Sequence, residues 1–449
     1  MTTVKTAIAV ALVPLAMIGA LQGVGAQFRA SDPGVRGGAD GAGGMIAGLS
    51  ASQIEFFNTS RGEFEGAEDP DEGLGPRLNL DSCVGCHSQP VSGGSAPRIN
   101  PQVEFATRGG AKNVVPSFIR LNGPVREARF QFNSDGSPDG GVHALFVISG
   151  RADAPGCNAQ QEDFETQVAN RNIVFRIPTP VFGTGLIEMI SDGAIESNRN
   201  SNSNSKAQFG ISGRANRNGN DGTITRFGWK AQNKSLLLFS GEAYNVEMGI
   251  TNDLFPDERG SNPGCGGLAA SPNSVTDTDG AANSEVVSAI EQFGFFMRFL
   301  APPVPVSSFR DASAASVNAG RQAFSNAGCA LCHTPSFRTG RSAINALSNK
   351  DVNLFSDLLV HNMGPGLADE VSQGAARGDE FRTAPLWGLG KRIFFLHDGR
   401  TEDLVTAIRA HRSGANSQFR ASEANTSVDV FNSFSEGTKQ NLLNFLRSL

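Results

Sequence analysis

Two copies of the pattern Cys-x-x-Cys-His constrain this 449-residue chain more than any other feature, and they occupy residues 83–87 and 329–333. Two thiols at this spacing can bond to the two vinyl groups of one porphyrin, and the adjacent histidine can then reach the iron. One such motif could also be a metal clip or a redox dithiol, but two in one chain predict two covalently attached c-type haems. The residues assigned in this way are Cys83, Cys86 and His87 for the first haem and Cys329, Cys332 and His333 for the second.

The start of the chain has the pattern of a secretory signal over residues 1–26. Lys5 supplies the positive charge, Ala7 to Ala20 the apolar stretch, and Val24 to Ala26 the small residues of a cleavage site. The alternative is an uncleaved anchor. No other segment approaches membrane-spanning length, so we expect a periplasmic or otherwise exported protein without a stable membrane span after signal cleavage.

The charge balance excludes a nucleic-acid partner, which would need a basic face. The formal net charge is −6, and removal of the signal, which carries one Lys and no acid, makes it −7. This mild acidity suits a basic electron donor.

Of six cysteines, two remain outside the haem motifs: Cys157 and Cys265, both in loops rich in Gly and Pro. In an oxidising compartment such a pair predicts a structural disulfide, with two free thiols as the alternative.

The aromatic composition is uneven, with 31 Phe but only 2 Trp and 1 Tyr. A strongly oxidising haem centre removes electrons from nearby Tyr and Trp and leaves Phe unchanged. We hypothesise that Trp229, Trp387 and Tyr244 are kept for a purpose; the alternative is a compositional habit of the lineage.

The fold class that we expect is mainly α, with two cytochrome-c-like haem domains. After the signal, the expected organisation is a flexible arm (27–50), an N-terminal haem domain with long loop-rich and some β insertions (51–300), a Pro-rich linker (301–311) and a C-terminal cytochrome-c-like domain (312–449).

Apolar spacing predicts helices near residues 52–64, 313–324 and 435–449. Short strand-like runs lie at 144–148 and 172–177. The Asn- and Ser-rich tract Ser197–Ser205 lacks apolar residues, so we expect an exposed loop there.

Each iron needs a sixth ligand or an open position, and this choice separates electron transfer from catalysis. Leu404, Ile408 and His411 lie at i, i+4 and i+7, which places His411 on the apolar face of a predicted helix. Beside a haem motif we interpret it as a ligand of the second iron. The other histidines outside the two motifs are His143, His361 and His397.

His397-Asp398-Gly399, together with the two haem motifs, resembles the bacterial di-haem cytochrome c peroxidase superfamily. In that superfamily the residue fourteen positions after the His-Asp-Gly histidine binds the second haem. It is Met in the peroxidases and Tyr in the enzyme that matures tryptophan tryptophylquinone. Here that position is His411, which implies a bis-histidine haem of lower potential than a His/Met one.

Trp229 and the segment 245–249 are similar to the inter-haem tryptophan and the distal glutamate of these peroxidases. The resemblance implies that Glu247 moves a proton between the oxygens of bound peroxide and that Trp229 carries electrons between the haems. Without it, an exposed carboxylate and a core aromatic would be the simpler interpretations.

More narrowly, the chain is similar to a di-haem oxidoreductase family whose members are described as peroxidases or thiol oxidoreductases. The stretches that carry this resemblance are residues 73–76, 150–157, 226–230, 381–387 and 397–400.

The expected function is peroxide reduction at the first haem, with electrons from a small redox donor, a cytochrome or cupredoxin, relayed by the second. The alternatives are a pure electron-transfer protein, or an oxygenase or protein-modifying oxidase that uses the same haem pair. The expected small substrate is hydrogen peroxide or another small oxidisable molecule. A thiol oxidase is the weakest alternative, because both Cys-x-x-Cys pairs are used by haem.

Three arginines are candidates for pairing with haem propionates: Arg151, Arg382 and Arg400. His143 either caps the first haem at rest or is a hydrogen-bonded loop histidine. His361 is expected to support the domain interface or a propionate. Related peroxidases hold calcium between domains, but nothing in this sequence indicates such a site.

Overall fold

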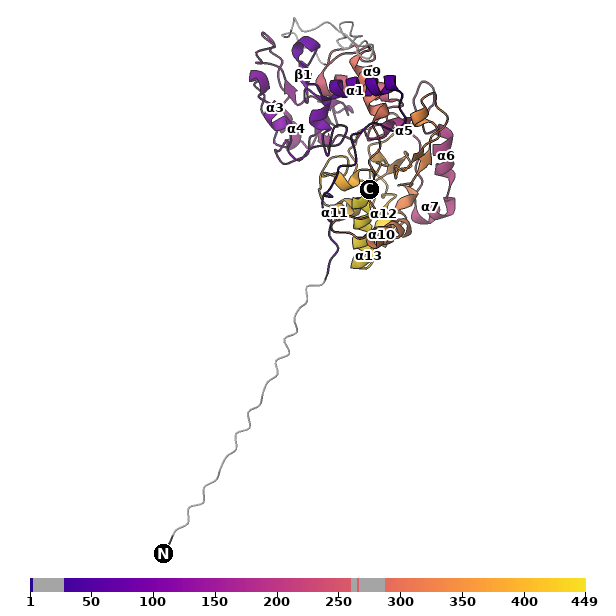
Figure 1. The fold of residues 1–449 in the computed structure, drawn as a ribbon. Helices are drawn as coiled ribbons and strands as arrows, with labels where there is room; N and C mark the ends of the chain where they lie inside the picture. Colours follow the sequence, from indigo (N-terminus) through magenta and orange to yellow (C-terminus); the bar gives the residue numbers. More distant parts are fainter. Residues whose placement is uncertain (3–27, 260–264, 266–286) are drawn as a thin grey trace.

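The computed structural model of the protein describes residues 1–2, 28–259, 265 and 287–449. The predicted signal therefore lies outside the described residues, except for its first two. The described chain is mainly helical with a few short strands, as the sequence predicts. In Figure 1 the helices α1, α3, α4 and α9 lie in the upper half and α10 to α13 in the lower half.

The helices begin and end as follows. In the described residues they are α1 (Ala51–Glu65), α2 (Cys83–Cys86), α3 (Gln102–Phe105), α4 (Phe164–Ala169), α5 (Thr184–Glu188), α6 (Asp192–Asn200), α7 (Ser203–Phe209), α8 (Leu236–Met248), α9 (Ala289–Phe299), α10 (Ala314–Asn326), α11 (Leu404–Ala410), α12 (Asn425–Ser433) and α13 (Glu436–Ser448). The predictions near 52–64, 313–324 and 435–449 are confirmed by α1, α10 and α13.

Within the described ranges, the strands form four small antiparallel sheets with the orders β1-β4, β3-β2-β5, β6-β7 and β8-β9. Their bounds are β1 (Arg77–Leu78), β2 (Glu127–Phe130), β3 (Val142–His143), β4 (Phe146–Val147), β5 (Ile173–Arg176), β6 (Phe337–Arg338), β7 (Asp351–Val352), β8 (Val360–Asn362) and β9 (Glu380–Arg382). Both strand-like runs of the sequence contain strands, β4 and β5. In the central sheet, Ala128 of β2 lies opposite His143 of β3 and Phe175 of β5.

The core of the N-terminal half is built by α1, α8 and α9. Phenylalanines interlock where α1 meets α9, with ring centroids of Phe57 and Phe64 at 5.6 and 4.5 Å from that of Phe296. Helix α8 joins them through Tyr244, whose ring meets that of Phe293 edge-on at 5.0 Å. Because aromatic side chains bury large areas, these contacts hold the helices together.

Glycine fixes the end of α8 against β1. Gly249 adopts the left-handed conformation, with φ of 75°, and a Cβ at this position would overlap the carbonyl oxygen of Arg77. The backbone just before Gly249 is held by the residue that follows β1, since Asn79 N–H donates to the carbonyl of Glu247 at 2.6 Å. The turn of α8 that carries Glu247 is therefore fixed.

In the lower half, α10 crosses α13 at close range. Gly320 makes this approach possible, because a Cβ there would overlap the carbonyl oxygen of Asn441. Beside the crossing, the rings of Phe324 and Phe445 meet edge-on at 5.4 Å. The first and last helices of this half therefore pack directly against each other.

Residues 28–50 are held along both halves, which does not match the flexible arm expected from their composition. The carboxylate of Asp32 accepts two hydrogen bonds of 2.7 Å from the Arg447 guanidinium, and both side chains are buried. Further along, Ile46 N–H donates to the carbonyl of Phe299 at 2.7 Å. A buried ion pair and backbone pairing fix this segment although it is rich in glycine.

The tract Ser197–Ser205 is exposed, as expected, but most of it is helical rather than a loop. It contains the end of α6 and the start of α7. The Ser191 hydroxyl caps α6 and Ile195 anchors it in the core. The buried Lys206 of α7 stabilises the junction between α6 and α7, because its Nζ donates to the carbonyls of Asn198 and Arg199 at 2.7 and 3.1 Å. Tertiary contacts outweigh weak local propensity here.

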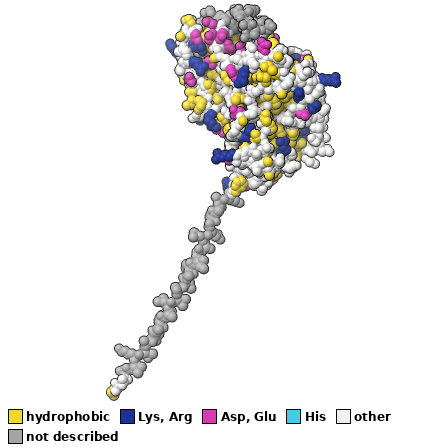
Figure 2. All heavy atoms as spheres, in the orientation of Figure 1, with side chains coloured by type: hydrophobic (Ala, Val, Ile, Leu, Met, Phe, Trp, Pro, Cys, Tyr) yellow, Lys and Arg dark blue, Asp and Glu magenta, His cyan; other side chains and the backbone are white. Residues whose placement is uncertain are grey.

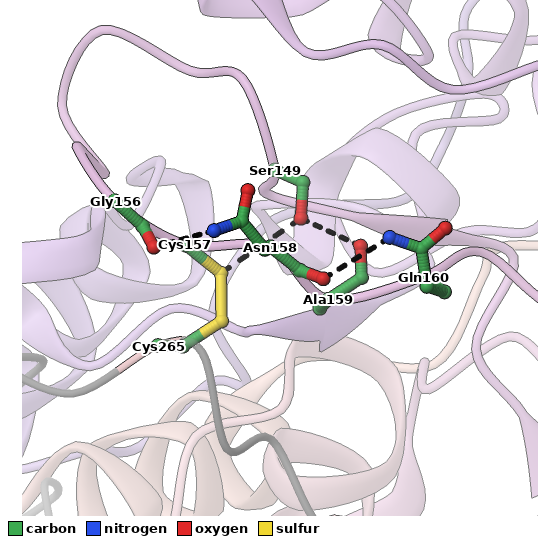
Figure 3. Close-up of a disulfide and its surroundings, with 7 residues drawn as sticks. All are labelled: Ser149, Gly156, Cys157, Asn158, Ala159, Gln160 and Cys265. Atoms are coloured by element: carbon green, nitrogen blue, oxygen red, sulfur yellow. Dashed lines mark hydrogen bonds between the residues drawn. A yellow bond between two sulfur atoms is a disulfide. The ribbon is translucent and has the colours of Figure 1, made fainter.

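The surface is mixed in character: Figure 2 shows acidic and basic side chains interspersed with apolar ones on one face. None of the helices in the described ranges is long and apolar enough to cross a membrane. The structure joins Cys157 and Cys265 in a disulfide, the pair that the cysteine count predicts. Figure 3 shows the loop beside it, in which the Ser149 hydroxyl donates to the carbonyl of Ala159 at 2.7 Å.

Candidate haem cavities

The first Cys-x-x-Cys-His motif borders a cavity in the N-terminal half. Cys83 and Cys86 are the ends of α2, and His87 follows as its C-cap. Nδ1 of His87 lies 2.9 Å from the carbonyl of Gly94, which leaves Nε2 available as a ligand. Burial lowers the pKa of His87 to about 4, so the ring is neutral. The cavity has a volume of about 160 Å³, counted as the space that the centre of a water molecule can occupy. Its walls include Phe64, Leu80, Val125, Phe239 and Met297.

The second motif borders a larger cavity of about 220 Å³ on the same measure. Nδ1 of His333 lies 3.0 Å from the carbonyl of Phe355, and Nδ1 of His411 lies 2.8 Å from that of Ala407. Both rings therefore keep Nε2 available, and both line the cavity. The pKa of His333 is lowered to about 4, first by burial and then by the charge of His411. The two rings are thus close enough to interact.

The donor groups in both cavities fit a haem. The cysteines of the two motifs are free and border the cavities. Burial raises the pKa of the Cys329 thiol to about 12, so this side chain is the neutral thiol rather than the thiolate. In each cavity a neutral histidine with a free Nε2 follows the cysteines directly.

Two buried guanidinium groups at the second cavity strengthen this fit. Arg382 and Arg392 line it, and the pKa of each is lowered to about 10 by burial. Nε of Arg382 donates to the carbonyl of Gly228 at 2.9 Å. Nε and Nη2 of Arg392 have no hydrogen-bond partner within the described part of the chain. Carboxylates of a bound group would satisfy such donors, as haem propionates do.

The other two arginines expected at propionates are engaged elsewhere. Arg151 pairs with Asp153 at 2.5 Å, and Arg400 pairs with Asp398 at 2.6 Å. Neither borders either cavity. Sequence analysis missed Arg392, whose only signal is its place five residues before His397 in an apolar stretch.

Trp229 lies between the two cavities and forms part of the wall of both. Its indole Nε1–H donates to the carbonyl of Ile177 at 2.8 Å. The ring of His397, which lines the second cavity, meets it edge-on at 6.4 Å and stacks on Phe381 at 4.3 Å. One aromatic side chain therefore contacts both spaces.

Glu247 lies in the wall of the first cavity and is partly buried. It accepts a hydrogen bond of 2.7 Å from the amide of Asn79. Its carboxyl also bonds to that of Glu127, which lines the same cavity. Burial, and then the charge of Glu127, raise the pKa of Glu247 to about 8. At neutral pH this group therefore holds a proton.

Glu127 completes a carboxyl pair that sequence analysis missed. Its Oε1 accepts a hydrogen bond of 2.7 Å from Nε of Arg129, two residues along β2. Burial works against its ionisation, but the charges of Arg129 and Arg176 together lower its pKa. Glu127 is thus the ionised member and Glu247 the protonated one. Glu127 and Arg129 form a Glu-x-Arg pattern in β2. This pattern is so common in strands that it could not predict the pairing of Glu127 with Glu247.

His143 and His361 lie in ion-paired clusters. His143 contacts Glu162 at 2.8 Å and Asp139 at 2.9 Å, and it does not line the first cavity. It is the hydrogen-bonded histidine of our two alternatives rather than a cap. His361 lines the second cavity, where its two nitrogens lie 2.8 Å from Glu423 and 2.9 Å from Asp357.

In the described residues, no group of three or more His, Cys, Asp or Glu side chains is arranged to hold a metal ion.

Several solved structures are distantly similar to this chain, among them the following two. Hydrazine synthase from Kuenenia stuttgartiensis is 15% identical, with 45% of this chain and 71% of that one covered and a TM-score of 0.23. A MauG-like protein associated with microbial copper homeostasis is 16% identical, with 61% and 90% covered and a TM-score of 0.30. Similarity this low carries no argument about the fold. No curated protein matches the chain.

A family model described as "Di-haem oxidoreductase, putative peroxidase" matches residues 126–449, which is most of the chain. The match contains the second haem motif, Trp229, Glu247 and His411, while the first motif precedes it. The chain belongs to this di-haem oxidoreductase family.

Proposed function

We propose that this protein is an exported c-type di-haem oxidoreductase that reduces hydrogen peroxide in the first cavity with electrons relayed from the second. The observation that carries the proposal is the hydrogen-bonded carboxyl pair of Glu127 and Glu247, which lines the cavity of His87. When bound, the haem iron supplies electron exchange and a position for the peroxide oxygen.

Thioether bonds to Cys83 and Cys86 would hold the first haem, and bonds to Cys329 and Cys332 the second. His87 is the iron ligand in the first cavity. Of the six histidines, all of which lie in the described ranges, only His87 lines that cavity. An open position for peroxide is consistent with this. His333 and His411 would complete the second iron and leave it no open position.

The carboxyl pair provides the proton chemistry. Reduction of peroxide to two waters consumes two electrons and two protons. Arg129 keeps Glu127 ionised, so the pair holds one proton, which resides on Glu247. The pair can take a proton from the near oxygen of peroxide and deliver one to the far oxygen, which then leaves as water. Asn79 fixes the orientation of Glu247 through its 2.7 Å hydrogen bond.

Trp229 would carry electrons between the two cavities. A small redox protein, a cytochrome or a cupredoxin, would deliver them at the second haem. Two cytochrome-c-like domains are part of the same proposal, and the close crossing of α10 and α13 at Gly320 supports the C-terminal one. A disulfide between Cys157 and Cys265 is typical of exported proteins and supports a periplasmic location.

Low-temperature electron paramagnetic resonance of the ferric protein tests the proposal. We expect one high-spin and one low-spin haem, with the high-spin signal consumed by one equivalent of hydrogen peroxide. Two low-spin signals that ignore peroxide, even after one-electron reduction, would instead identify an electron carrier. Product formation without an electron donor would identify an oxygenase or oxidase.

The rate constant for peroxide, measured against pH, tests the carboxyl pair. Because the pKa of Glu247 is about 8, its acid form is present below that pH and the rate should fall above it. Glu247→Gln should lower the rate by roughly 10²–10⁴ at every pH. Glu127→Gln removes the charge that raises this pKa, so the fall should begin at lower pH.

The control for these variants is Glu104→Gln, which changes an exposed glutamate of α3 in the same way. Its profile should coincide with that of the unmodified protein. A Glu127→Gln profile that also coincides would contradict the role of the pair.

A further inference from the structure

Tyr244 is the only tyrosine of the chain, and it lies in the wall of the first cavity. It precedes Glu247 by three residues in α8, so both side chains lie on one helix face. Its ring is buried, with 4% of its surface exposed, and meets the ring of Phe293 edge-on at 5.0 Å. The function proposed above assigns it no role.

The hydroxyl of Tyr244 is hydrogen-bonded to the carboxylate of Glu68. Glu68 is only partly buried, and its backbone N–H donates to the carbonyl of Asp81 at 2.8 Å. It therefore connects the cavity wall with solvent. Burial raises the pKa of Glu68 to about 7, and three neighbouring acids add to this effect: Glu63, Glu72 and Asp69.

A phenol hydrogen-bonded to a carboxylate is suited to one-electron oxidation. Loss of an electron makes the phenol a strong acid, so oxidation is easiest where a base already accepts its proton. The aromatic neighbours of Tyr244 in this wall are phenylalanines, which are much harder to oxidise: Phe64, Phe239 and Phe293. Trp229 is the other oxidisable aromatic side chain in the wall of this cavity, but its N–H donates to a backbone carbonyl, whereas the hydroxyl of Tyr244 has a carboxylate as its acceptor.

We propose that Tyr244 and Glu68 form a second, proton-coupled entry for electrons into the first cavity. Tyr244 gives one electron to the haem centre oxidised by hydrogen peroxide and its hydroxyl proton to Glu68, which leaves a neutral tyrosyl radical. A small one-electron donor at the surface returns the electron, and Glu68 returns the proton. The acidic surroundings of Glu68 favour a donor with positive charge. This inference rests on the peroxide reaction of the proposed function.

Freeze-quench electron paramagnetic resonance of the haem-loaded protein after peroxide tests the inference. Since the chain has one tyrosine, ring-deuterated tyrosine labels Tyr244 alone, without a substitution. We expect a radical signal that narrows on deuteration and disappears in Tyr244→Phe. Glu68→Gln should lower its yield at least tenfold. A signal that is absent, or unchanged by deuteration, while peroxide consumes the high-spin iron signal would overturn the inference alone.

An iron signal that does not respond to peroxide would overturn the proposed function and this inference together, which separates the two failures. The lifetime of the Tyr244 radical tests the charge of the electron donor. A cationic one-electron donor should shorten it more than an anionic donor of the same potential. Equal lifetimes would overturn the choice of a cationic donor.

Discussion

At the scale of single residues, the ring orientation of His411 makes it the best candidate for the sixth ligand of the second iron. Its Nδ1 is fixed by the carbonyl of Ala407 at 2.8 Å, so the free Nε2 is the nitrogen available to the cavity. A neutral imidazole in this position stabilises ferric iron more than a thioether does. In the proposed function, the residue at 411 would therefore set the potential at which electrons enter the second haem.

His411→Met should raise the reduction potential of the second haem by on the order of 0.1 V, within the ~0.8 V that axial ligands span. Potentiometric titration followed by optical spectra measures this change, and the first haem should keep its potential. The control is Arg412→Gln, which removes an exposed ion pair with Asp429 beside the ligand. A potential that is the same in all three proteins would mean that His411 does not bind the iron.

At the scale of elements, the contact between α10 and α13 depends on a glycine. Gly320→Ala would push its Cβ into the carbonyl of Asn441, so the helices must separate, at a cost of about 1–3 kcal/mol of unfolding free energy. Gly437→Ala, in α13 with no atom near its Cβ, should instead stabilise by ~0.5–1 kcal/mol. Thermal unfolding of the holoprotein should therefore give midpoints that move in opposite directions. If the unfolding midpoints of the two variants shifted equally, the close packing of α10 on α13 at Gly320 would be contradicted.

The elements also show what sequence patterns could predict. Apolar periodicity located α1, α10 and α13, because each has one buried face. It failed at Ser197–Ser205, where a cap and the buried Lys206 hold helices that local propensity would not. The partner of Glu247 was missed for a related reason: Glu127 is 120 positions away, and only the fold brings the two carboxyl groups into one cavity. Contacts between distant segments leave no periodic signal.

At the scale of the whole molecule, the two halves are continuous. The largest apolar cluster combines side chains from before the Pro-rich segment 301–305 with Leu354, Leu358 and Trp387 from after it. Residues 28–50 bind the lower half through the buried pair of Asp32 and Arg447. The sequence indicated a boundary at the prolines, but composition cannot reveal which faces are shared across it. The shared core keeps the two cavities in a fixed relation.

Because the two cavities are held in place relative to each other, Trp229, which contacts both, is well placed to carry electrons between them. Trp229→Phe keeps an apolar ring but removes the oxidisable indole and its hydrogen bond to Ile177. Electron transfer from the second haem to the first should slow roughly tenfold or more, and each tenfold change corresponds to ~1.4 kcal/mol of activation free energy. Rapid photoreduction of the second haem, followed optically, measures this step.

The chain supplies a matched control in its only other tryptophan. Trp387 is also buried but lines neither of the two haem cavities, so Trp387→Phe should leave the transfer rate unchanged. Both substitutions remove one indole from the core and cost similar packing energy. Equal slowing in both variants would point to a general loosening of the core, and no slowing in either would mean that electrons bypass Trp229. Only a selective effect of Trp229→Phe identifies the indole between the cavities as the route by which one haem serves the other.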